Sequence, residues 1–262
     1  MTIAGSDSSG GAGIQADLKT FSALGVYGAS VITAVTAQNT LAVDRAETMP
    51  QGMVHDQIRT VLDDLDVDAV KIGMLSSSEV IREVFEALDE YRGHIVLDPV
   101  MVAKSGDSLL ADDAVDTLRA LLLPRADLIT PNLPEAAVLT DAAEAKSSEE
   151  ALAQGQTLLS LGARAVLVKG GHGSESVCTD WLIAARQKPV RLTSPRIRTT
   201  NTHGTGCTYS AAIAACLAKS ESIEDAVRHS HHYLAGAIRA ADRLGIGAGH
   251  GPVHHFHGIW DE

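Results

Sequence analysis

The feature that most constrains the fold of this chain is a regular alternation of short apolar segments with helical segments. Each apolar segment has the length of a β-strand, and the connections to the helical segments are short. This rhythm predicts an α/β fold in which a mostly parallel central sheet carries helices on both faces. We expect strands at 1–4, 29–37, 69–73, 94–97, 126–130 and 165–169, and helices at 14–24, 51–65, 76–91, 111–123, 134–139, 148–161 and within 204–244.

The rhythm changes between residues 176 and 193. The stretches V-C-T-D-W-L-I and P-V-R-L-T in this region are typical of antiparallel strands, which predicts a small antiparallel edge on the sheet. No linker, internal repeat or low-complexity segment interrupts the 262 residues, so a single domain over 1–262 is expected. Only 3 % of the residues are aromatic, and Ala, Val, Ile and Leu must therefore build the core.

Charge and cysteine content argue against several classes of protein. The formal net charge of −12 repels phosphate backbones, so no nucleic-acid partner is expected. No apolar run reaches the ~18–20 residues of a membrane-spanning helix, and the first residues lack the features of a signal peptide. The three cysteines, Cys178, Cys207 and Cys216, include no C-x-x-C pair. We therefore expect no disulfide framework and a cytoplasmic location.

Glycine-rich and polar segments follow several of the predicted strands. Ligands bind beyond the carboxyl ends of the strands in an open parallel sheet, which favours a ligand site there over a set of ordinary turns. The loop from Gly5 to Gly13 has neither a Walker nor a dinucleotide fingerprint. Its residues alone are compatible with close approach to a ligand or with a flexible connector. Other residues at strand ends are Gln38, Met74, Asp98, Asn132, Glu135 and Lys169.

The segment Gly204-Thr205-Gly206-Cys207 leads into an alanine-rich helical stretch. Free N–H groups at such a helix start, with the helix dipole behind them, form an anion hole that stabilises a transferring phosphoryl group. The same setting is expected to lower the pKa of Cys207, which could then accept a proton from a hydroxyl or act as a nucleophile. The alternative is an inert cysteine packed at a helix start.

The remaining polar residues are compatible with a role in the site and with a purely structural role. Glu135, three residues after Asn132 at a helix start, either holds Mg²⁺ through water or faces solvent. Lys169 either brings its own ammonium charge to a phosphate group or faces solvent. We interpret the histidines at 229–232 and 254–257 as structural, because a zinc site needs three or four rigidly held ligands.

Together these motifs resemble the bacterial hydroxymethylpyrimidine/phosphomethylpyrimidine kinases of thiamine biosynthesis, members of the ribokinase-like superfamily. Family members usually have a few residues before the first strand, whereas Met1 stands almost at the strand here. The motifs run in family order: A-G-S-D-S-S-G-G-A-G-I-Q-A-D-L-K-T at 4–20, A-Q-N-T at 37–40, K-I-G-M-L at 71–75, L-D-P-V-M at 97–101, T-P-N-L-P-E-A at 130–136, V-K-G-G-H at 168–172, N-T-H-G-T-G-C-T at 201–208 and G-P-V-H-H-F-H at 251–257.

The resemblance implies ATP-dependent phosphorylation of a hydroxymethyl group on a pyrimidine, and then of the resulting monophosphate. The superfamily usually places an aspartate base after the glycine loop, and the pyrimidine kinases place a cysteine there. Cys207 would thus be a general base or an orienting group for the hydroxyl. The implied sites are catalytic Cys207, Gly204, Thr205 and Gly206; pyrimidine-binding Gln38, Asp17, Gly5 and Met74; ATP-binding Lys169, Asn132 and Asn201; and Mg²⁺-binding Glu135 and Asp98.

Three alternatives are considered beside this interpretation. A pyridoxal kinase shares the fold, but the N-T-H-G-T-G-C and A-Q-N segments favour a pyrimidine. A non-catalytic binding module would be expected to have lost motif residues, and all are intact. A cysteine hydrolase needs a histidine and an acid beside Cys207, and His203 is poorly placed in the sequence for this. The resemblance also implies a cytoplasmic homodimer. Because exposed sheet edges tend to be covered, the predicted edge strands at 176–193 are the candidate dimer surface.

Overall fold

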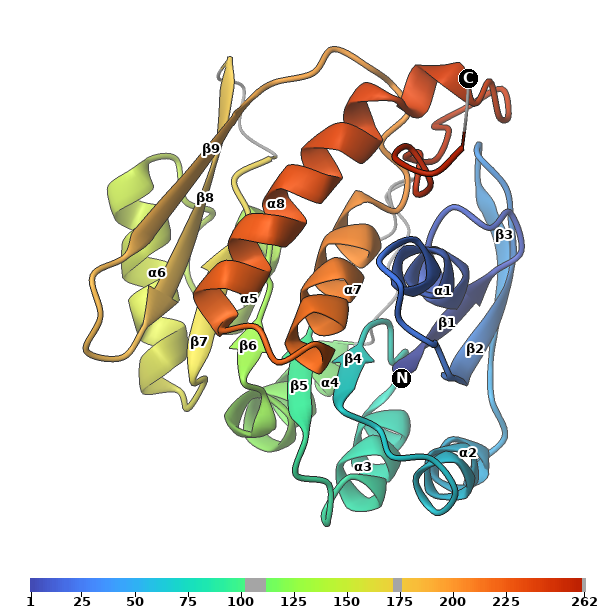
Figure 1. Cartoon of the computed structure of the whole chain (residues 1–262). Coiled ribbons are helices and arrows are strands. Elements are labelled where there is room, and N and C mark those ends of the chain that lie inside the picture. Colours follow the sequence, from blue (N-terminus) through green and yellow to red (C-terminus); the bar gives the residue numbers. More distant parts are fainter. Residues whose placement is uncertain (102–111, 172–175, 261–262) are drawn as a thin grey trace.

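The computed structural model describes residues 1–101, 112–171 and 176–260. Its described strands form one nine-stranded sheet in the order β3-β2-β1-β4-β5-β6-β7-β8-β9 (Figure 1). Position 111, where a helix was expected to begin, and His172 of the V-K-G-G-H motif lie outside the described residues. The strands are β1 Thr2–Asp7, β2 Ser30–Gln38, β3 Val43–Thr48, β4 Ala69–Ile72, β5 His94–Leu97, β6 Leu128–Ile129, β7 Ala165–Val168, β8 Val177–Ala184 and β9 Val190–Pro195.

The centre of the sheet is parallel and both edges are antiparallel. Strands β2, β1, β4, β5, β6 and β7 pair in parallel with their neighbours. At one edge β8 pairs antiparallel with both β7 and β9, which confirms the predicted edge. At the other edge β3 pairs antiparallel with β2, and the sequence did not predict this strand. Its residues are exposed or half-buried and mostly charged or small, so it lacks the apolar signal of the central strands.

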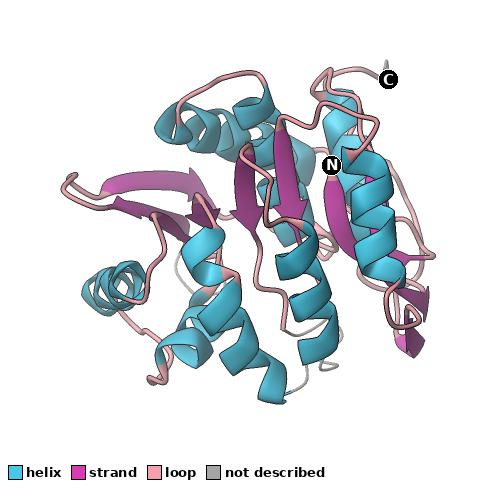
Figure 2. Cartoon of the chain, turned by 90° about the horizontal axis from the view of Figure 1, so that it is seen from below, coloured by secondary structure: helices cyan, strands magenta, loops and turns pink. Residues whose placement is uncertain are grey.

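Helices cover both faces of the sheet, as predicted (Figure 2). None of the described helices combines the length and apolar character needed to cross a bilayer. The helices are α1 Gly13–Ala23, α2 Met53–Leu62, α3 Ser78–Ala87, α4 Asp112–Leu121, α5 Leu133–Thr140, α6 Ser148–Ser160, α7 Thr205–Ala218 and α8 Ile223–Arg239, with short 3₁₀ turns at Leu123–Arg125 and Ala241–Arg243.

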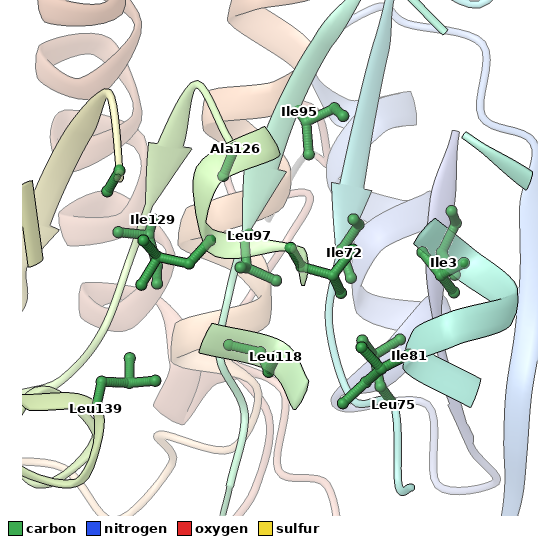
Figure 3. Packing of buried hydrophobic residues seen from close by; sticks show 14 of the residues in the cluster. Ile3, Ile72, Leu75, Ile81, Ile95, Leu97, Leu118, Ala126, Ile129 and Leu139 are labelled. Carbon is green, nitrogen blue, oxygen red and sulfur yellow. The ribbon is translucent and has the colours of Figure 1, made fainter. Parts of the chain in front are cut away.

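Two hydrophobic cores result from the alternation of side chains along the buried strands. In β5, Ile95 and Leu97 point into the core beneath α2 to α6, whereas Val96 points into the core beneath α1, α7 and α8. Figure 3 shows the first core, where Ile72 of β4 and Leu97 of β5 lie beside Leu118 of α4. Helix α7 is buried along most of its length in the second core, which fixes its N-terminus beyond the ends of the central strands.

Candidate active site

The last glycine motif begins helix α7. Gly204 is the N-terminal cap of α7, with φ +75° and ψ 9°. A Cβ atom on Gly204 would lie 1.8 Å from the carbonyl oxygen of Gly11, so the left-handed backbone and the close approach of the first loop both require glycine. Thr205 donates through its hydroxyl to the carbonyl of Thr202 at 2.7 Å and steadies the turn. The Thr205 N–H also donates to the Thr202 carbonyl, at 3.3 Å. The helix start therefore leaves the N–H groups of Gly206 and Cys207 for a ligand.

The first glycine loop is organised around the carboxylate of Asp7. One oxygen of Asp7 accepts hydrogen bonds from the backbone and hydroxyl of Ser9, and the other accepts from the N–H groups of Gly11 and Ala12. The second oxygen also lies 2.7 Å from Nε2 of His203 in the last motif. Burial alone would raise the pKa of Asp7, but the bonds from His203 and Ser9 lower it to about 2. These contacts favour an ordered cradle over a flexible connector.

Gly206 lies over an ion pair formed by a half-buried lysine and a buried aspartate. Lys169 follows β7 and Asp98 follows β5, and the Lys169 Nζ lies 2.8 Å from the Asp98 Oδ1. A Cβ atom on Gly206 would lie 3.5 Å from the Lys169 Nζ and 3.6 Å from the Asp98 Oδ2. An anion at the first turn of α7 would therefore meet both backbone N–H groups and the Lys169 ammonium.

Asp98 holds Lys169 and the start of α7 in place through its hydrogen bonds. Its side chain is buried, and its Oδ1 accepts a hydrogen bond from the Thr130 hydroxyl at 2.9 Å as well as from Lys169. Its Oδ2 accepts from the Ser210 hydroxyl of α7 at 3.1 Å. Burial raises the pKa of Asp98, but the positive charges of Lys169 and Lys71 outweigh it, so the pKa is lowered. The carboxylate is therefore ionised and joins β5, β7 and α7.

Asn132 and Glu135 form the capping box of α5. The Asn132 side chain accepts from the N–H of Glu135, and Oε2 of Glu135 accepts from the N–H of Asn132, each at 2.8 Å. Glu135 is only 7 % exposed, so it is not a solvated side chain. Burial raises its pKa to about 7; the charge of Lys169 opposes this rise and the charge of Asp98 adds to it. Two buried carboxylates near one lysine suit a hydrated divalent cation.

Cys207 lies in the first turn of α7 and is half-buried. The backbone N–H of Gly13 in the first loop acts on the thiol to lower its pKa. Burial raises the pKa of the Cys207 thiol to about 11; the charge of Lys71 opposes the rise, and the carboxylates of Asp17 and Asp98 add to it. The predicted lowering of this pKa is therefore wrong, because burial and two carboxylates outweigh the helix end and the lysine.

Asp17 lies in the interior of the protein rather than at an open surface. Its carboxylate is fully buried, with Oδ2 at 2.9 Å from the Nζ of Lys71 and 2.6 Å from the Thr2 hydroxyl that donates to it. Burial lowers the pKa of Lys71, but the charge of Asp17 outweighs burial and the pKa is raised. The contact of Asp17 with a pyrimidine, implied by the resemblance, stays a prediction.

The other predicted pyrimidine-binding residues lie at β1, β2 and the end of β4. A Cβ atom on Gly5 would lie 2.9 Å from the sulfur of Met74, so these two residues are in contact. The Ser8 hydroxyl holds the backbone of Gln38, donating to its carbonyl at 2.8 Å and accepting from its N–H at 2.9 Å. The Thr36 hydroxyl donates to Oε1 of Gln38 at 3.1 Å. The structure therefore places Gln38 beside the first loop.

Asn201 has partners within the chain at both ends of its amide. Its Nδ2 donates to Asp242 at 2.8 Å, and its Oδ1 accepts from the N–H of Gly251 at 3.1 Å. The amide thus fastens the G-P-V-H-H-F-H segment to the last glycine motif. Its predicted contact with ATP stays a prediction.

The histidines near the C-terminus have structural partners. His255 lies 3.1 Å from the Thr208 hydroxyl, and burial lowers its pKa to about 3, which keeps the ring neutral. The ring of His257 lies 3.1 Å from the carbonyl of His254. Over the described ranges, one group of side chains with metal-ligand spacing is found: Cys216 of α7, Glu221 between α7 and α8, and His229 of α8.

Three residues that build the site were missed by sequence reasoning. Lys71 had a signal, because it is the charged residue inside the apolar strand A-V-K-I, and a buried charge needs a partner. Asp7 and His203 each lie in a glycine motif, but no local pattern shows that they pair with each other. His203 is therefore engaged by Asp7, which gives no support to a role as base for Cys207.

The fold and the site define a small-molecule kinase of the ribokinase-like type. Among solved structures, the ADP complex of Bacillus subtilis pyridoxal kinase is similar with a TM-score of 0.91 and 35 % identity, covering 99 % of this chain and 98 % of that chain.

Sequence comparisons show to which family of small-molecule kinases the chain belongs. The family model described as phosphomethylpyrimidine kinase matches residues 7–254. The hydroxymethylpyrimidine/phosphomethylpyrimidine kinase of Escherichia coli (strain K12) is 52 % identical over 99 % of this chain and 98 % of its own length. The protein of that name from Rhizobium meliloti (strain 1021) is 55 % identical over 100 % of this chain and 98 % of its own length. The chain belongs to the phosphomethylpyrimidine kinase family, which confirms the resemblance.

Proposed function

We propose that this kinase transfers the γ-phosphoryl group of ATP to 4-amino-5-hydroxymethyl-2-methylpyrimidine and then to its monophosphate, in thiamine biosynthesis. The observation that carries the proposal is the position of Gly206 over the Lys169–Asp98 pair, with Cys207 as the next residue. This arrangement puts a phosphate-binding helix end and a proton-accepting group side by side. The names of the Escherichia coli and Rhizobium meliloti relatives support the pyrimidine substrate.

In the first transfer the substrate hydroxyl oxygen attacks the γ-phosphorus of ATP. A new oxygen–phosphorus bond forms as the bond to the β-phosphate oxygen breaks, and ADP leaves. The N–H groups at the start of α7 and the Lys169 ammonium stabilise the charge on the transferring group. Cys207 orients the hydroxyl, accepts its proton as a thiolate, and later returns the proton to solvent.

In the second transfer the nucleophile is a phosphate oxygen of the monophosphate. Such an oxygen is ionised near neutral pH and carries no proton that must be removed. The anion-binding residues therefore serve both transfers, whereas proton uptake by Cys207 serves the first.

ATP is expected to place its phosphates against Lys169, Asn132 and the start of α7, and the ADP complex of the similar pyridoxal kinase supports nucleotide use. The buried carboxylates of Glu135 and Asp98 are the residues that would hold Mg²⁺. When bound, the ion would supply positive charge to the phosphate groups. Asp98 is already engaged by Lys169, so it would shape the field around the ion more than coordinate it directly.

The pyrimidine is proposed to lie between the first loop and the end of β4. The Gln38 amide would read the hydrogen-bonding edge of the ring, because an analogue without that edge leaves buried polar groups unpaired. Met74, which packs on Gly5, would cover the face of the ring. Asp17 would support this pocket from the interior.

We also propose that the protein is a cytoplasmic homodimer. Its three cysteines are free, which suits a reducing compartment. Strand β9 ends the sheet and gives a second copy an edge to cover. Sedimentation equilibrium at micromolar concentration should give the mass of a dimer, and a monomer mass would contradict the proposal.

The test of the activity is ADP release with Mg-ATP and each of three acceptors: the hydroxymethylpyrimidine, its monophosphate, and pyridoxal. We expect turnover with both pyrimidines and little with pyridoxal. Preference for pyridoxal would instead assign the activity of the structurally similar pyridoxal kinases. Lys169→Met should lose most activity with every acceptor, whereas the matched control Lys188→Met, at an exposed position, should retain it.

A further inference from the structure

Three side chains of the kinds that bind metal ions meet where α7 turns into α8. Cys216 lies in the last turn of α7, Glu221 in the connection between the helices, and His229 in α8. The Cys216 Sγ, a carboxylate oxygen of Glu221 and a ring nitrogen of His229 all lie within 4.8 Å of one another. The Nδ1 of His229 is 3.3 Å from the Oε1 of Glu221. The transfer steps described above use none of these three side chains.

The backbone holds the three side chains in fixed relative positions. The carbonyl of Cys216 accepts hydrogen bonds from the N–H groups of Lys219 at 3.0 Å and of Glu221 at 3.3 Å. Ser222 follows Glu221 directly and caps the start of α8 with its hydroxyl. Helices α7 and α8 pack side by side, which keeps His229 beside Cys216 (Figure 1). The cluster therefore meets the requirement that metal ligands be held rigidly.

The cluster extends from the interior of the protein to its surface. Cys216 is fully buried, Glu221 is half-buried and His229 is exposed, which gives an ion a path from solvent. The Ser230 hydroxyl lies 3.9 Å from the Cys216 sulfur and donates to it. An outer hydrogen bond of this kind orients a metal ligand.

The charged residues around the cluster favour a cation. The Lys219 ammonium donates to the carbonyl of Leu24 at 3.0 Å, and the Arg228 guanidinium pairs with Glu224 at 2.7 Å. These two cations are thus engaged away from Glu221. The formal net charge of −12 also attracts cations to the protein as a whole.

We propose that Cys216, Glu221 and His229 bind a zinc ion that joins the end of α7 to α8. Thiolate, imidazole and carboxylate together suit Zn²⁺, whereas Mg²⁺ and Ca²⁺ take oxygen ligands. Donor atoms on one tetrahedral zinc lie roughly 3.4–3.6 Å apart, so adjustments of about 1 Å would bring the cluster to this spacing. Water would take the fourth position.

Binding exchanges a proton for the metal ion. Burial and the negative charge of Glu221 raise the pKa of the Cys216 thiol to about 11, so the thiol is protonated near neutral pH without a cation. Zinc would form a bond to the sulfur as the S–H bond breaks, and the proton would pass to solvent.

The zinc site is separate from the candidate active site. Cys216 follows Cys207 by nine residues, which is about 14 Å along the axis of α7. The ion would be structural, which agrees with the structural role that the sequence predicts for His229. The inference does not depend on the proposed phosphoryl transfer.

The experiment measures metal binding to the full chain after dialysis against a chelator. Isothermal titration with Zn²⁺ should show one ion per chain, and excess Zn²⁺ should raise Tm by several °C. Titration with Co²⁺ should give the near-ultraviolet absorption band of a cobalt–thiolate bond. Failure of the wild-type chain to bind Zn²⁺ would overturn the proposal.

Variants at two histidines of α8 test which residues hold the ion. His229→Ala should weaken Zn²⁺ binding at least about tenfold and remove the rise in Tm. The matched control His232→Ala, at another exposed position of the same helix, should bind Zn²⁺ as wild type does. Wild-type affinity in His229→Ala, or equal losses in the two variants, would overturn the proposal.

Two cysteine variants identify the thiolate. Cys216→Ser should lose the cobalt–thiolate band, whereas Cys207→Ala should keep it. The opposite result would place the ion at the start of α7 and overturn the proposal. If Cys216→Ser does not fold, Glu221→Gln keeps the test intact, because it changes a half-buried side chain of similar size. It should weaken Zn²⁺ binding at least about tenfold, and wild-type affinity would overturn the proposal.

Kinase assays separate this inference from the proposed function. His229→Ala should turn over the hydroxymethylpyrimidine with Mg-ATP within about twofold of wild type, because the zinc site lies away from the reacting groups. Absence of turnover in wild type would contradict the proposed function, while the zinc titration would still stand.

Discussion

Asp7 and His203 join the two glycine motifs across 196 residues of sequence, with 2.7 Å between the Asp7 Oδ2 and the His203 Nε2. The pKa of Asp7 is lowered to about 2, so the carboxylate is ionised near neutral pH and can only accept. His203 therefore donates this hydrogen bond. The bond holds the first loop against the start of α7, where Gly11 and Gly204 are in close contact.

Asp7→Asn should weaken both the fold and the site. An amide cannot accept all the bonds that Asp7 receives from Ser9, Gly11, Ala12 and His203, and we expect the free energy of unfolding to fall by about 2–4 kcal/mol at pH 7. The folded pKa lies below the unfolded one, so Asp7 stabilises the fold above about pH 4, and this contribution is lost as pH falls toward 2. Urea denaturation at pH 7, 4 and 3 measures both effects.

The control for Asp7→Asn is Asp66→Asn, at an exposed position. It should leave the free energy of unfolding within about 0.5 kcal/mol of wild type. The free energy of the Asp7→Asn variant should also depend less on pH between 4 and 3 than that of wild type. Equal stability of Asp7→Asn and wild type at all three pH values would show that the carboxylate does not organise the loop.

The two glycines of the last motif should fail in different ways when they are changed to alanine. Gly204→Ala forces a Cβ atom against the Gly11 carbonyl in a left-handed conformation, so the protein should lose several °C in Tm together with its activity. Gly206→Ala meets Lys169 and Asp98 at ordinary contact distances, so its Tm should stay near wild type. Its extra methyl group occupies the anion site, and kcat/KM for ATP should fall at least tenfold. Thermal unfolding and initial rates separate these outcomes.

The central strands of the sheet could be predicted because each is buried on both faces. β5 and β7 are short apolar runs between helical patterns, and the predicted ranges 94–97 and 165–169 nearly coincide with the observed strands. β3 could not be predicted, because an exposed edge strand such as V-D-R-A-E-T pairs through its backbone and needs no apolar side chains.

The parts of the site that lie within one sequence motif could be predicted. The parts that depend on contacts between distant motifs could not. The sequence placed Gly204–Cys207 at a helix start, because glycine followed by helix formers is a local pattern. The ionisation of Cys207 was predicted with the wrong sign, because it depends on burial and on Asp17, Asp98 and Lys71, which come from other strands and helices. Electrostatics of this kind is set by tertiary packing and leaves no trace in local spacing.

Glu135→Gln should make the protein more stable at high pH in the absence of Mg²⁺. The folded pKa of Glu135 is raised to about 7, above the unfolded value, so stability is full below about pH 4.5 and is lost as pH rises through 7. The glutamine side chain of this variant cannot ionise, yet it can still accept the Asn132 N–H of the capping box. We expect the variant to exceed wild type by roughly 2–3 kcal/mol at pH 8 and to match it near pH 4.5 in urea denaturation.

Addition of Mg²⁺ provides the control for Glu135→Gln. If Glu135 holds the ion, Mg²⁺ with a nucleotide should stabilise wild type at pH 8 more than the variant, and the variant should need a higher Mg²⁺ concentration for half-maximal activity. A variant that is less stable than wild type at pH 8 would contradict the role of burial. An unchanged Mg²⁺ requirement would remove Glu135 from the metal site.

Cys207 should matter for the first phosphorylation and much less for the second. With its pKa at about 11, the thiolate fraction rises about tenfold per pH unit below that value, so single-turnover rates with the hydroxymethylpyrimidine should rise with pH between 6 and 9. Cys207→Ala should lose on the order of 10²-fold or more at pH 9 and become nearly independent of pH. The monophosphate brings an ionised oxygen, so its transfer should fall less than about tenfold in the same variant.

Cys207→Ser distinguishes proton uptake from orientation of the hydroxyl. Serine keeps a hydrogen-bonding group at the start of α7 but does not ionise in this pH range. If Cys207 is the base, Cys207→Ser should be as slow as Cys207→Ala with the hydroxymethylpyrimidine. If the serine variant retains the wild-type rate, or if wild type shows no pH dependence, the side chain only orients the hydroxyl. The helix end and Lys169 would then carry the catalysis alone, because a loose phosphoryl-transfer transition state depends chiefly on positioning and charge neutralisation.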